Sequence, residues 1–294
     1  MTTDGEATVV VGLIGAGIGG SFSPALHERE ASLLGFDYAY RLLDLDELRR
    51  AASDVGALVR EARRDGLRGL NVTHPCKQLV VPELDELSPE AASLGAVNTI
   101  VFSAGRLVGH NTDFSGFQEA FERRLPGART DRVVLLGAGG AGAAVAHAIL
   151  SLGAGHLTVV DVELERAEAL AGALGQRFGA RSAAAAEVTT LAGLLSESDG
   201  LIHATPTGMD AHPGTAVPAE LLHPRLWVAE VVYMPIETQL LKDARERGCR
   251  TLDGAAMVAL QAAGSLELFT GARPDRDRMV AHVDELIAGA SQAA

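Results

Sequence analysis

A glycine-rich turn between two apolar runs occupies the middle of the chain. The run VVLL at 133–136 leads into Gly137-Ala138-Gly139-Gly140-Ala141-Gly142, and the proline-free run AAVAHAIL follows at 143–150. The next run, HLTVV at 156–160, ends in Asp161, nineteen residues beyond Gly142. This order predicts a strand, a turn, a helix whose N-terminal amides face a pyrophosphate, and a strand ending in a carboxylate that faces ribose hydroxyls. We interpret it as a dinucleotide site that includes Gly137, Ala138, Gly139, Gly140, Ala141 and Asp161. The alternative is that the glycines serve only close helix–strand packing.

The carboxylate at position 161 also bears on which dinucleotide binds. An acidic side chain there accepts hydrogen bonds from ribose hydroxyls, whereas a 2′-phosphate would meet like charge and would require a nearby cation. Val162 and Glu163 follow Asp161, and the first cation is Arg166. The sequence therefore favours NAD over NADP.

The same glycine spacing occurs earlier, at Gly15-Ala16-Gly17-Ile18-Gly19-Gly20. This copy also follows an apolar run, but Ser21-Phe22-Ser23-Pro24 interrupts the chain before a helix can begin. No later strand ends unambiguously in an acidic residue at the required distance. We interpret this copy as a loop that binds substrate.

Short β-branched runs alternate with longer amphipathic runs, which is typical of an α/β fold. In the first half we expect strands at 9–14, 38–43 and 70–73, helices at 24–34, 47–64 and 114–124, and a hairpin at 97–102 and 107–109 that makes the sheet mixed. In the second half we expect strands at 133–136, 157–160, 201–204 and 227–232, and helices at 141–152, 164–174, 255–269 and 277–288. The second series has the pattern of a doubly wound nucleotide-binding sheet.

The 294-residue length and a Pro-Gly break at 125–128 indicate two domains. We predict a mixed-sheet substrate domain at residues 1–115 and a Rossmann-type dinucleotide domain at 116–254. The C-terminal helices, at 255–294, are expected to pack back on the first domain.

The charge balance bears on partners and location. The chain carries 38 acidic and 25 basic residues, for a net charge of −13, which disfavours binding to nucleic acid or to an anionic membrane surface. Asp4 and Glu6 precede a short apolar run where a signal peptide would carry Lys or Arg, and no apolar run has the length of a membrane helix. Two distant cysteines agree with a reducing compartment. We expect a cytoplasmic protein; the sequence does not indicate its oligomeric state.

Lysine is rare in this sequence, because 23 of the 25 basic residues are arginine and only Lys77 and Lys242 are lysine. A lysine can exchange a proton when it is desolvated, whereas an arginine effectively cannot. Lys77 follows an expected strand in the segment Asn71-Val72-Thr73-His74-Pro75-Cys76-Lys77, so a catalytic role and a plain surface role at a helix start are both open. Asp113 could be catalytic or could cap the helix that follows it.

Other chemistry-bearing side chains are less promising. The histidines at positions 27, 74, 110 and 212 have no metal-ligand spacing, so we expect no metal site. Cys76 lies beside Lys77 without an evident base partner, and we interpret it as a packing residue.

Six segments together resemble the shikimate dehydrogenases along essentially the whole chain. They are Ser21-Phe22-Ser23-Pro24, Asn71 to Lys77, Gly95-Ala96-Val97-Asn98-Thr99, Asn111-Thr112-Asp113, the second glycine loop, and Asp253-Gly254 with Gln261-Ala262. The sequence is most similar to the NAD-dependent quinate/shikimate dehydrogenase branch, because Asp161 stands where NADP-using members have Asn-Arg-Thr. The segment Val231-Val232-Tyr233-Met234-Pro235-Ile236-Glu237-Thr238 also resembles that branch.

The resemblance implies a role for individual residues. Lys77 and Asp113 match the catalytic acid–base pair, and Ser21 and Ser23 match residues that bind the substrate carboxylate. Thr73, Asn98, Tyr233 and Gln261 would bind the same carboxylate or the ring hydroxyls. Further cofactor contacts would come from Arg166, Thr205, Val231, Gly254 and Met257, the last two near the nicotinamide.

The resemblance implies reversible hydride transfer between NAD and a ring hydroxyl of shikimate or quinate, as in the shikimate pathway of aromatic amino acid biosynthesis. Proton removal by Lys77, assisted by Asp113, agrees with the needs of alcohol oxidation. Three alternatives stay open: a modified substrate such as an aminoshikimate, an NADP-dependent biosynthetic enzyme, and a non-catalytic dinucleotide sensor.

Overall fold

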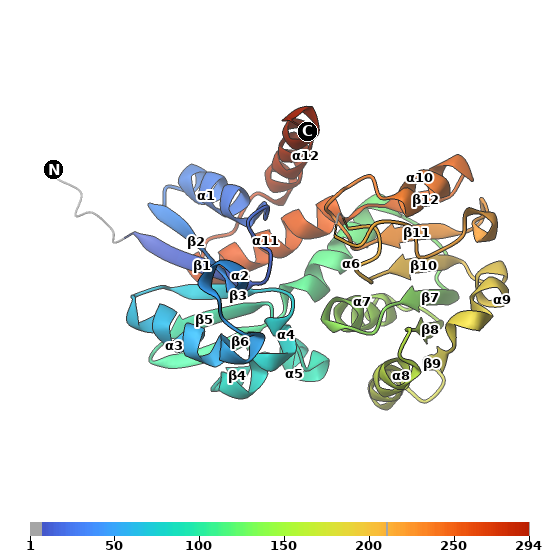
Figure 1. Cartoon of the computed structure of the whole chain (residues 1–294), viewed down its shortest axis with the longest axis horizontal. Helices are drawn as coiled ribbons and strands as arrows, with labels where there is room; N and C mark the ends of the chain where they lie inside the picture. Colours follow the sequence, from blue (N-terminus) through green and yellow to red (C-terminus); the bar gives the residue numbers. More distant parts are fainter. Residues whose placement is uncertain (1–7, 210, 294) are drawn as a thin grey trace. The chain divides into compact units, whose positions relative to one another are not determined.

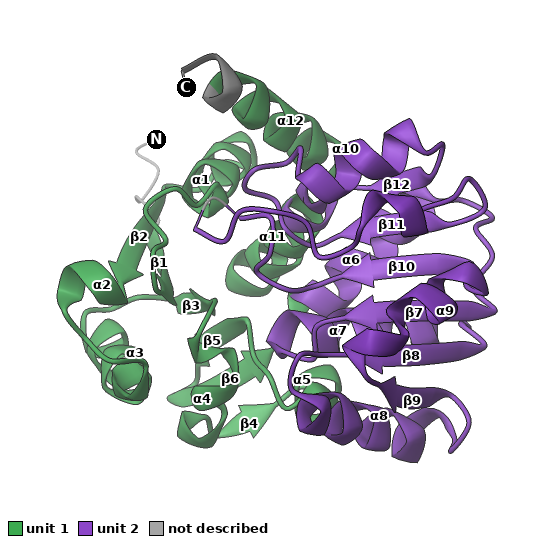
Figure 2. Ribbon diagram, turned by 45° about the vertical axis from the view of Figure 1, so that its right-hand side comes forward, with its two compact units in different colours: residues 1–112, 259–294 green, residues 113–258 purple. Residues whose placement is uncertain are grey.

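The computed structural model describes residues 8–209 and 211–293. The chain divides into two compact units, residues 1–112 with 259–294 and residues 113–258 (Figure 2). The first unit is therefore discontinuous in sequence, and its C-terminal part follows the whole of the second unit. Asp4 and Glu6, on which the expectation about export rests, lie outside the described residues.

The first unit contains a mixed six-stranded sheet in the order β2-β1-β3-β5-β6-β4. Its central strand β1 pairs in parallel with β2 and β3, whereas β5 runs antiparallel to both β3 and β6. The expected mixed sheet is confirmed. The strands are β1 (Val9–Gly15), β2 (Tyr38–Asp44), β3 (Gly69–Val72), β4 (Glu86–Leu87), β5 (Thr99–Ser103) and β6 (Arg106–His110) (Figure 1).

The predicted hairpin is formed by β5 and β6. Its two central residues, Ala104 and Gly105, have φ values of 47° and 81°. Positive φ at both positions is what a two-residue turn of type I′ requires, and this turn matches the twist of the flanking strands.

The helix expected at 47–64 is interrupted in the structure. Asp44 caps the short helix α2 (Leu45–Leu48) by accepting a hydrogen bond from the backbone amide of Asp46, and Arg49 ends it in the left-handed region with φ of 54°. A short 3₁₀ turn (Ala52–Asp54) then leads into α3 (Val55–Arg64). Local capping overrides the continuous amphipathic pattern here.

The other helices of the first unit are α1 (Ser23–Leu33), α4 (Cys76–Leu79) and α5 (Pro89–Leu94), with a 3₁₀ turn at Val81–Glu83. One face of the sheet packs on α3 through Leu58 and Val59, which share a cluster with Ile14, Leu70 and Ile100. In a second hydrophobic cluster, Phe269 of the C-terminal region packs with Val11, Leu13 and Tyr40. The first unit therefore needs residues from both ends of the chain to complete its core.

The second unit contains six parallel strands in the order β12-β11-β10-β7-β8-β9. The strand order reverses at β7, so the sheet is doubly wound as predicted. The strands are β7 (Arg132–Leu136), β8 (His156–Val160), β9 (Ala183–Ala186), β10 (Gly200–His203), β11 (Trp227–Glu230) and β12 (Arg250–Leu252). The sequence analysis did not predict β9 or β12.

The helices of the second unit begin with α6 (Thr112–Arg124), of which all but the first residue belongs to this unit. Phe121 of α6 packs edge-on against Trp227, at a ring-centroid distance of 4.9 Å. The others are α7 (Gly140–Ser151), α8 (Leu164–Phe178), α9 (Leu191–Ser196) and α10 (Gln239–Glu246), with 3₁₀ turns at Val188–Thr190 and Ala219–Leu221.

Two C-terminal helices complete the structure, α11 (Gly254–Thr270) and α12 (Arg276–Ala293). The greater part of α11 and the whole of α12 belong to the first unit. Arg278 of α12 binds the buried Glu30 of α1 at 2.6 Å, and this ion pair fastens the end of the chain to the beginning. None of the helices in the described part of the chain combines the length and the apolarity that crossing a membrane requires.

Candidate functional site

The glycines of the second motif have three different environments, which match the three tasks of a dinucleotide loop. Gly137 has φ of +103°, and a Cβ atom there would lie 2.6 Å from the carbonyl oxygen of Ala204. A Cβ atom on Gly142 would lie 2.0 Å from the carbonyl oxygen of Gly137. At Gly139, which caps α7, a Cβ atom would have no neighbour within 4 Å. The first and third glycines permit the turn and the close packing, and the second leaves open space where a pyrophosphate can approach the helix N-terminus.

Asp161 lies at the end of β8, beside this loop. Its carboxylate accepts hydrogen bonds from the backbone amides of Ala138 at 2.7 Å and of Glu163 at 3.0 Å. Arg166 pairs with the Glu163 side chain at 2.9 Å. Val162 is 90% exposed. These residues fit the adenosine end of a dinucleotide, because the carboxylate is held in place next to the glycine loop.

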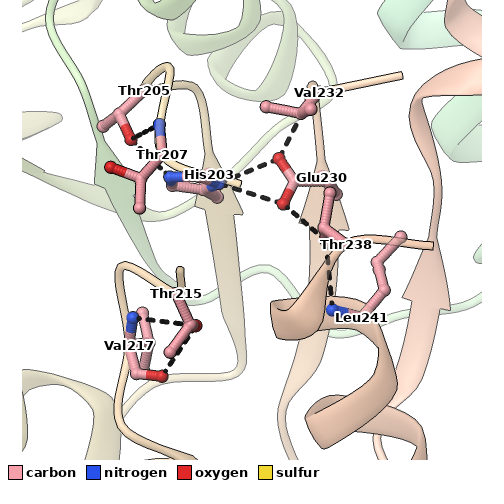
Figure 3. A network of polar contacts seen from close by, with 9 residues as sticks. All are labelled: His203, Thr205, Thr207, Thr215, Val217, Glu230, Val232, Thr238 and Leu241. Carbon is pink, nitrogen blue, oxygen red and sulfur yellow. Dashed lines mark hydrogen bonds and ion pairs between the residues drawn. The ribbon is translucent and has the colours of Figure 1, made fainter. Parts of the chain in front are cut away.

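The ends of β10 and β11 carry polar side chains that the sequence analysis overlooked (Figure 3). His203 and Glu230 are neighbours in the strand register, and the Nδ1 atom of His203 lies 2.8 Å from the Oε1 atom of Glu230. The Nε2 atom of His203 lies 2.5 Å from the hydroxyl of Thr205, a predicted cofactor contact. A charged residue at the end of the apolar run WVAE was the signal that could have identified Glu230.

Gly254 begins α11 close to two other predicted site residues. A Cβ atom at this position would lie 2.9 Å from the carbonyl oxygen of Val231 and 3.0 Å from the Cβ atom of Tyr233. Glycine therefore lets the helix start against the chain that follows β11. Met257 lies one turn further along α11 and is buried.

The first glycine motif has its backbone amides bound to protein. Asp44, at the end of β2, accepts hydrogen bonds from the amides of Gly17 at 3.1 Å and Ile18 at 2.8 Å. Whereas Asp161 follows Gly142 by nineteen positions, Asp44 at the end of β2 follows Gly20 by twenty-four. Those two amides are occupied by this carboxylate, which agrees with the interpretation that this loop is not a pyrophosphate site.

Ser21 and Ser23 follow this loop at the start of α1. The backbone amide of Ser23 donates to the hydroxyl of Ser21 at 3.3 Å, and both side chains are half-buried. Thr73 lies beside the loop, since a Cβ atom on Gly15 would be 2.3 Å from its methyl group. The structure thus brings the segment after β1 and the segment after β3 together.

Lys77 is half-buried in α4, four positions after Thr73 in the sequence. Its carbonyl oxygen accepts a hydrogen bond from the backbone amide of Val97 at 2.8 Å. Val97 precedes Asn98, whose side-chain amide lies 3.5 Å from the Oε1 atom of Gln261 on α11. Lys77, Asn98 and Gln261 are therefore joined to one framework within the first unit.

A buried polar network holds Asn98. Its Oδ1 atom accepts from the backbone amide of Thr112 at 2.8 Å, and its amide group donates to the Thr112 hydroxyl at 2.9 Å. Ser265, one turn after Gln261, contacts the hydroxyls of Thr112 at 3.1 Å and Thr99 at 2.8 Å. Asn71 and Tyr40 extend this network. Apart from Asn98 itself, the sequence analysis gave none of these residues a place in such a network.

Asp113 follows Thr112 and is buried. Helix α6 begins at Thr112 rather than at 114, so Asp113 lies inside the first turn and is not the N-cap residue. Lys77 lies in the first unit, whereas Asp113 and Tyr233 lie in the second.

Cys76 and Cys249 are both free and buried. Burial raises the pKa of the Cys76 thiol, which disfavours the thiolate form that a nucleophile needs. Within residues 8–209 and 211–293, no cluster of three His, Cys, Asp or Glu side chains is arranged to hold a metal ion.

Two family models match parts of the chain. The shikimate dehydrogenase substrate binding domain matches residues 13–100, and the saccharopine dehydrogenase NADP binding domain matches residues 133–212. The first match includes Ser21 to Asn98, and the second covers the glycine loop, Asp161 and Thr205.

Similar proteins align along nearly the whole chain. A shikimate dehydrogenase (NADP(+)) of Streptomyces avermitilis is 62% identical over 97% of each chain. A quinate/shikimate dehydrogenase (NAD(+)) of Corynebacterium efficiens is 46% identical over 92% of this chain and 96% of the relative. The solved structure of quinate dehydrogenase from Corynebacterium glutamicum in complex with NAD has a TM-score of 0.87 and 45% identity, covering 93% of this chain and 97% of that chain. This chain therefore belongs to the shikimate dehydrogenase family of oxidoreductases.

Proposed function

We propose that this protein interconverts shikimate and 3-dehydroshikimate, or quinate and 3-dehydroquinate, with NAD as its preferred cofactor. The observation that supports this most directly is the shared framework of Lys77, Asn98 and Gln261. A backbone hydrogen bond of 2.8 Å joins the Lys77 and Val97 segments, and the Asn98 and Gln261 amides are 3.5 Å apart. One proton-exchanging side chain and two amides on a single scaffold suit a ring that carries several hydroxyl groups.

In this proposal the residues of the first unit bind and deprotonate the substrate. Ser21 and Ser23 hydrogen-bond its carboxylate, and Thr73, Asn98, Tyr233 and Gln261 bind the same carboxylate or the ring hydroxyls. Lys77 takes the proton from the reacting hydroxyl, and Asp113 hydrogen-bonds the same hydroxyl. A dinucleotide held by the glycine loop would supply the hydride acceptor. In the reverse direction, the protonated Lys77 returns the proton to the forming alkoxide.

The preference for NAD rests on the surroundings of Asp161. Two backbone amides hold its carboxylate beside the glycine loop, where it can accept hydrogen bonds from ribose hydroxyls. A 2′-phosphate would meet the negative charges of Asp161 and Glu163, and the nearest cation in sequence, Arg166, pairs with Glu163. The names of the relatives include both cofactors, so the comparison of rates with NAD and NADP is decisive.

The test of the activity is a set of initial rates for shikimate and quinate, each with NAD and NADP. The two lysines provide a matched pair of variants: Lys77→Ala should lower kcat by about 10² to 10⁴, the range of general acid–base catalysis, and should still bind NAD. Lys242→Ala, at an exposed position of α10, should keep the parent rate. An equal loss of kcat in both variants, or parent-like turnover by Lys77→Ala, would contradict the catalytic role of Lys77. No turnover with either acid would instead favour a modified substrate or a sensor.

The test of cofactor choice is the double variant Asp161→Asn with Val162→Arg. Removing the carboxylate and adding a guanidinium at an exposed position should raise kcat/KM for NADP and lower it for NAD, about tenfold each. A parent enzyme that already prefers NADP would refute the preference for NAD.

A further inference from the structure

His203 and Glu230 form a completely buried pair at the carboxyl ends of β10 and β11. They are 0% and 2% exposed, and they lie directly opposite each other in the parallel register. The His203 Nδ1 atom lies 2.8 Å and 3.0 Å from the two carboxylate oxygens of Glu230. Burial of such groups is unfavourable unless every polar atom has a partner, so the additional contacts of the pair decide what it does.

Each end of the pair reaches a segment that carries a predicted cofactor residue. On one side, Glu230 accepts hydrogen bonds from the backbone amide of Val232 at 3.0 Å and from the hydroxyl of Thr238 at 3.1 Å. On the other side, the His203 Nε2 atom lies 2.5 Å from the Thr205 hydroxyl. Figure 3 shows these contacts as one chain of hydrogen bonds that crosses from the loop after β10 to the loop after β11.

The partners of Glu230 determine the direction of the hydrogen bonds. Its two oxygens accept from an amide and a hydroxyl, so the carboxylate also accepts from His203, which places the imidazole proton on Nδ1. The other ring nitrogen, Nε2, lies 2.5 Å from the Thr205 hydroxyl and forms the next hydrogen bond of the chain. The Thr205 oxygen also accepts from the backbone amide of Thr207 at 3.3 Å. These two contacts fix the orientation of the Thr205 side chain.

The two ends of this chain touch glycines of the predicted cofactor site. The methyl group of Thr205 lies 3.1 Å from the place of a Cβ atom on Gly137, the first glycine of the dinucleotide loop. The carbonyl oxygen of Val232 lies 2.7 Å from the corresponding place on Gly254. The pair therefore connects three parts of the second unit: the glycine loop, the segment after β10 and the segment after β11.

We propose that His203 and Glu230 are positioning residues for the dinucleotide site, and that they act through Thr205. This inference rests on the proposed dinucleotide-dependent function and on the cofactor contacts that the resemblance to shikimate dehydrogenases implies for Thr205 and Val231. Glu230 orients the His203 ring, and His203 in turn orients the Thr205 hydroxyl. Thr205 then presents an oriented hydroxyl to the cofactor and does not have to be ordered when the cofactor binds.

The test is a double-mutant cycle on the full-length protein, read as the dissociation constant for NAD by titration calorimetry. His203→Asn keeps a nitrogen near the place of Nδ1, facing Glu230, but cannot reach Thr205. Thr205→Val removes the hydroxyl and keeps the shape. Each single variant should raise the dissociation constant about tenfold, equivalent to about 1.4 kcal/mol. Because His203 acts through Thr205, the two effects should not add. The double variant should raise the dissociation constant for NAD about tenfold, as each single variant does, and not a hundredfold.

Two further measurements separate positioning from a general loss of structure. Thr215→Val removes a hydroxyl that hydrogen-bonds to the backbone of Val217 in the same unit, and it should leave NAD binding unchanged. His203→Gln, which keeps a nitrogen near the place of Nε2, should bind NAD more tightly than His203→Asn. The KM for the substrate should not change in any variant, since the first unit supplies most of the residues proposed to bind the substrate.

The outcomes separate the two proposals. A parent protein that binds neither NAD nor NADP would overturn the proposed function. A parent that binds NAD, together with parent-like binding by His203→Asn or a hundredfold effect in the double variant, would overturn only the positioning role. If His203→Asn does not fold, the comparison of Thr205→Val, His203→Gln and their double variant decides in the same way.

Discussion

Gly137, Gly139 and Gly142 share one loop, yet an added methyl group would meet a different environment at each. At Gly137 and Gly142 it would press on backbone atoms within 2.6 Å, so substitution there would disturb the fold. At Gly139 it would enter open space, the space that a cofactor needs. Stability and binding can therefore be separated at single residues of this loop.

Gly139→Ala should lower the unfolding free energy by only about 1 kcal/mol, because alanine is a poorer N-cap residue than glycine, and should raise the dissociation constant for the dinucleotide at least tenfold. The reason is that the new methyl group occupies the approach to the N-terminus of α7. Calorimetric titration with NAD and thermal unfolding would measure both quantities. Gly172→Ala, in the exposed part of α8, is the matched control: it should stabilise by about 0.5–1 kcal/mol and leave binding unchanged. Parent-like affinity in Gly139→Ala would contradict the placement of the cofactor.

His27 is a second residue whose environment gives a measurable prediction. Burial lowers its pKa to about 3, and its Nδ1 atom lies 3.0 Å from the hydroxyl of Tyr38. The folded protein therefore keeps His27 neutral, whereas the unfolded chain takes up a proton below about pH 6.5. As the pH falls from about 6.5 to about 3, the protonation of His27 in the unfolded chain should lower the unfolding free energy by about 1.4 kcal/mol for each pH unit.

The measurement is denaturant unfolding at several pH values for the parent and two variants. His27→Gln should flatten the pH dependence, because the titrating group is removed. Tyr38→Phe removes the same hydrogen bond but leaves the imidazole, so it should lower stability without changing the slope. An unchanged slope in His27→Gln would show that other groups account for the acid sensitivity.

At the scale of elements, α11 is the helix that organises the buried polar network of the first unit. Gln261 and Ser265 lie four residues apart on it, and Ser265 contacts Asn71, Thr99 and Thr112 beneath Asn98. All of these side chains are buried except Gln261, which is half-buried. The position of Asn98 is therefore set jointly by a loop before β5, the start of α6 and a helix from the other end of the chain.

Ser265→Ala should lower the unfolding free energy by about 1–3 kcal/mol, because it leaves buried polar groups without a partner. It should also raise the KM for the substrate while the dissociation constant for NAD stays the same. Ser93→Ala removes an exposed hydrogen bond from its hydroxyl to the carbonyl oxygen of Glu90 within α5, and it should change neither quantity by more than experimental error. An equal effect on NAD and substrate would contradict a role confined to the first unit.

The local elements were the ones that the sequence predicted well. The glycine loop, α7, β8 and Asp161 lie within thirty residues, and the hairpin turn at Ala104-Gly105 is decided by two adjacent residues. The helix at 47–64 failed because capping by Asp44 and the left-handed Arg49 break it. The network around Asn98 was missed because it joins residues as distant as Asn71 and Ser265, and a serine in a helix gives no signal of what it touches.

For the whole molecule, the decisive property is that the second unit interrupts the first. Phe269 packs with Val11 and Tyr40, and Arg278 binds Glu30, so residues 259–293 complete the core and the polar contacts of the first unit. The second unit is continuous, and its six-stranded sheet is formed entirely by residues 132–252.

A fragment of residues 113–258 should therefore fold alone, unfold cooperatively and bind NAD. A fragment of residues 1–112 should lack cooperative unfolding, because α11 and α12 are missing from it. A fragment in which a short flexible linker joins residues 1–112 to residues 259–294 should again unfold cooperatively. Circular dichroism and denaturant unfolding of the three fragments would check this, and a cooperative transition in 1–112 alone would contradict it.

The contact between Phe269 and β1 also has a consequence for synthesis on the ribosome. Chains emerge from the N-terminus, so the first 112 residues leave the exit tunnel long before Phe269 and Arg278 do. The nucleotide-binding unit can fold while translation continues. The sheet of the first unit is synthesised earlier, but its apolar surface stays exposed until Phe269 has been synthesised. During that interval the nascent polypeptide is a substrate for chaperones and proteases, and slow translation of the last codons would lengthen its exposure.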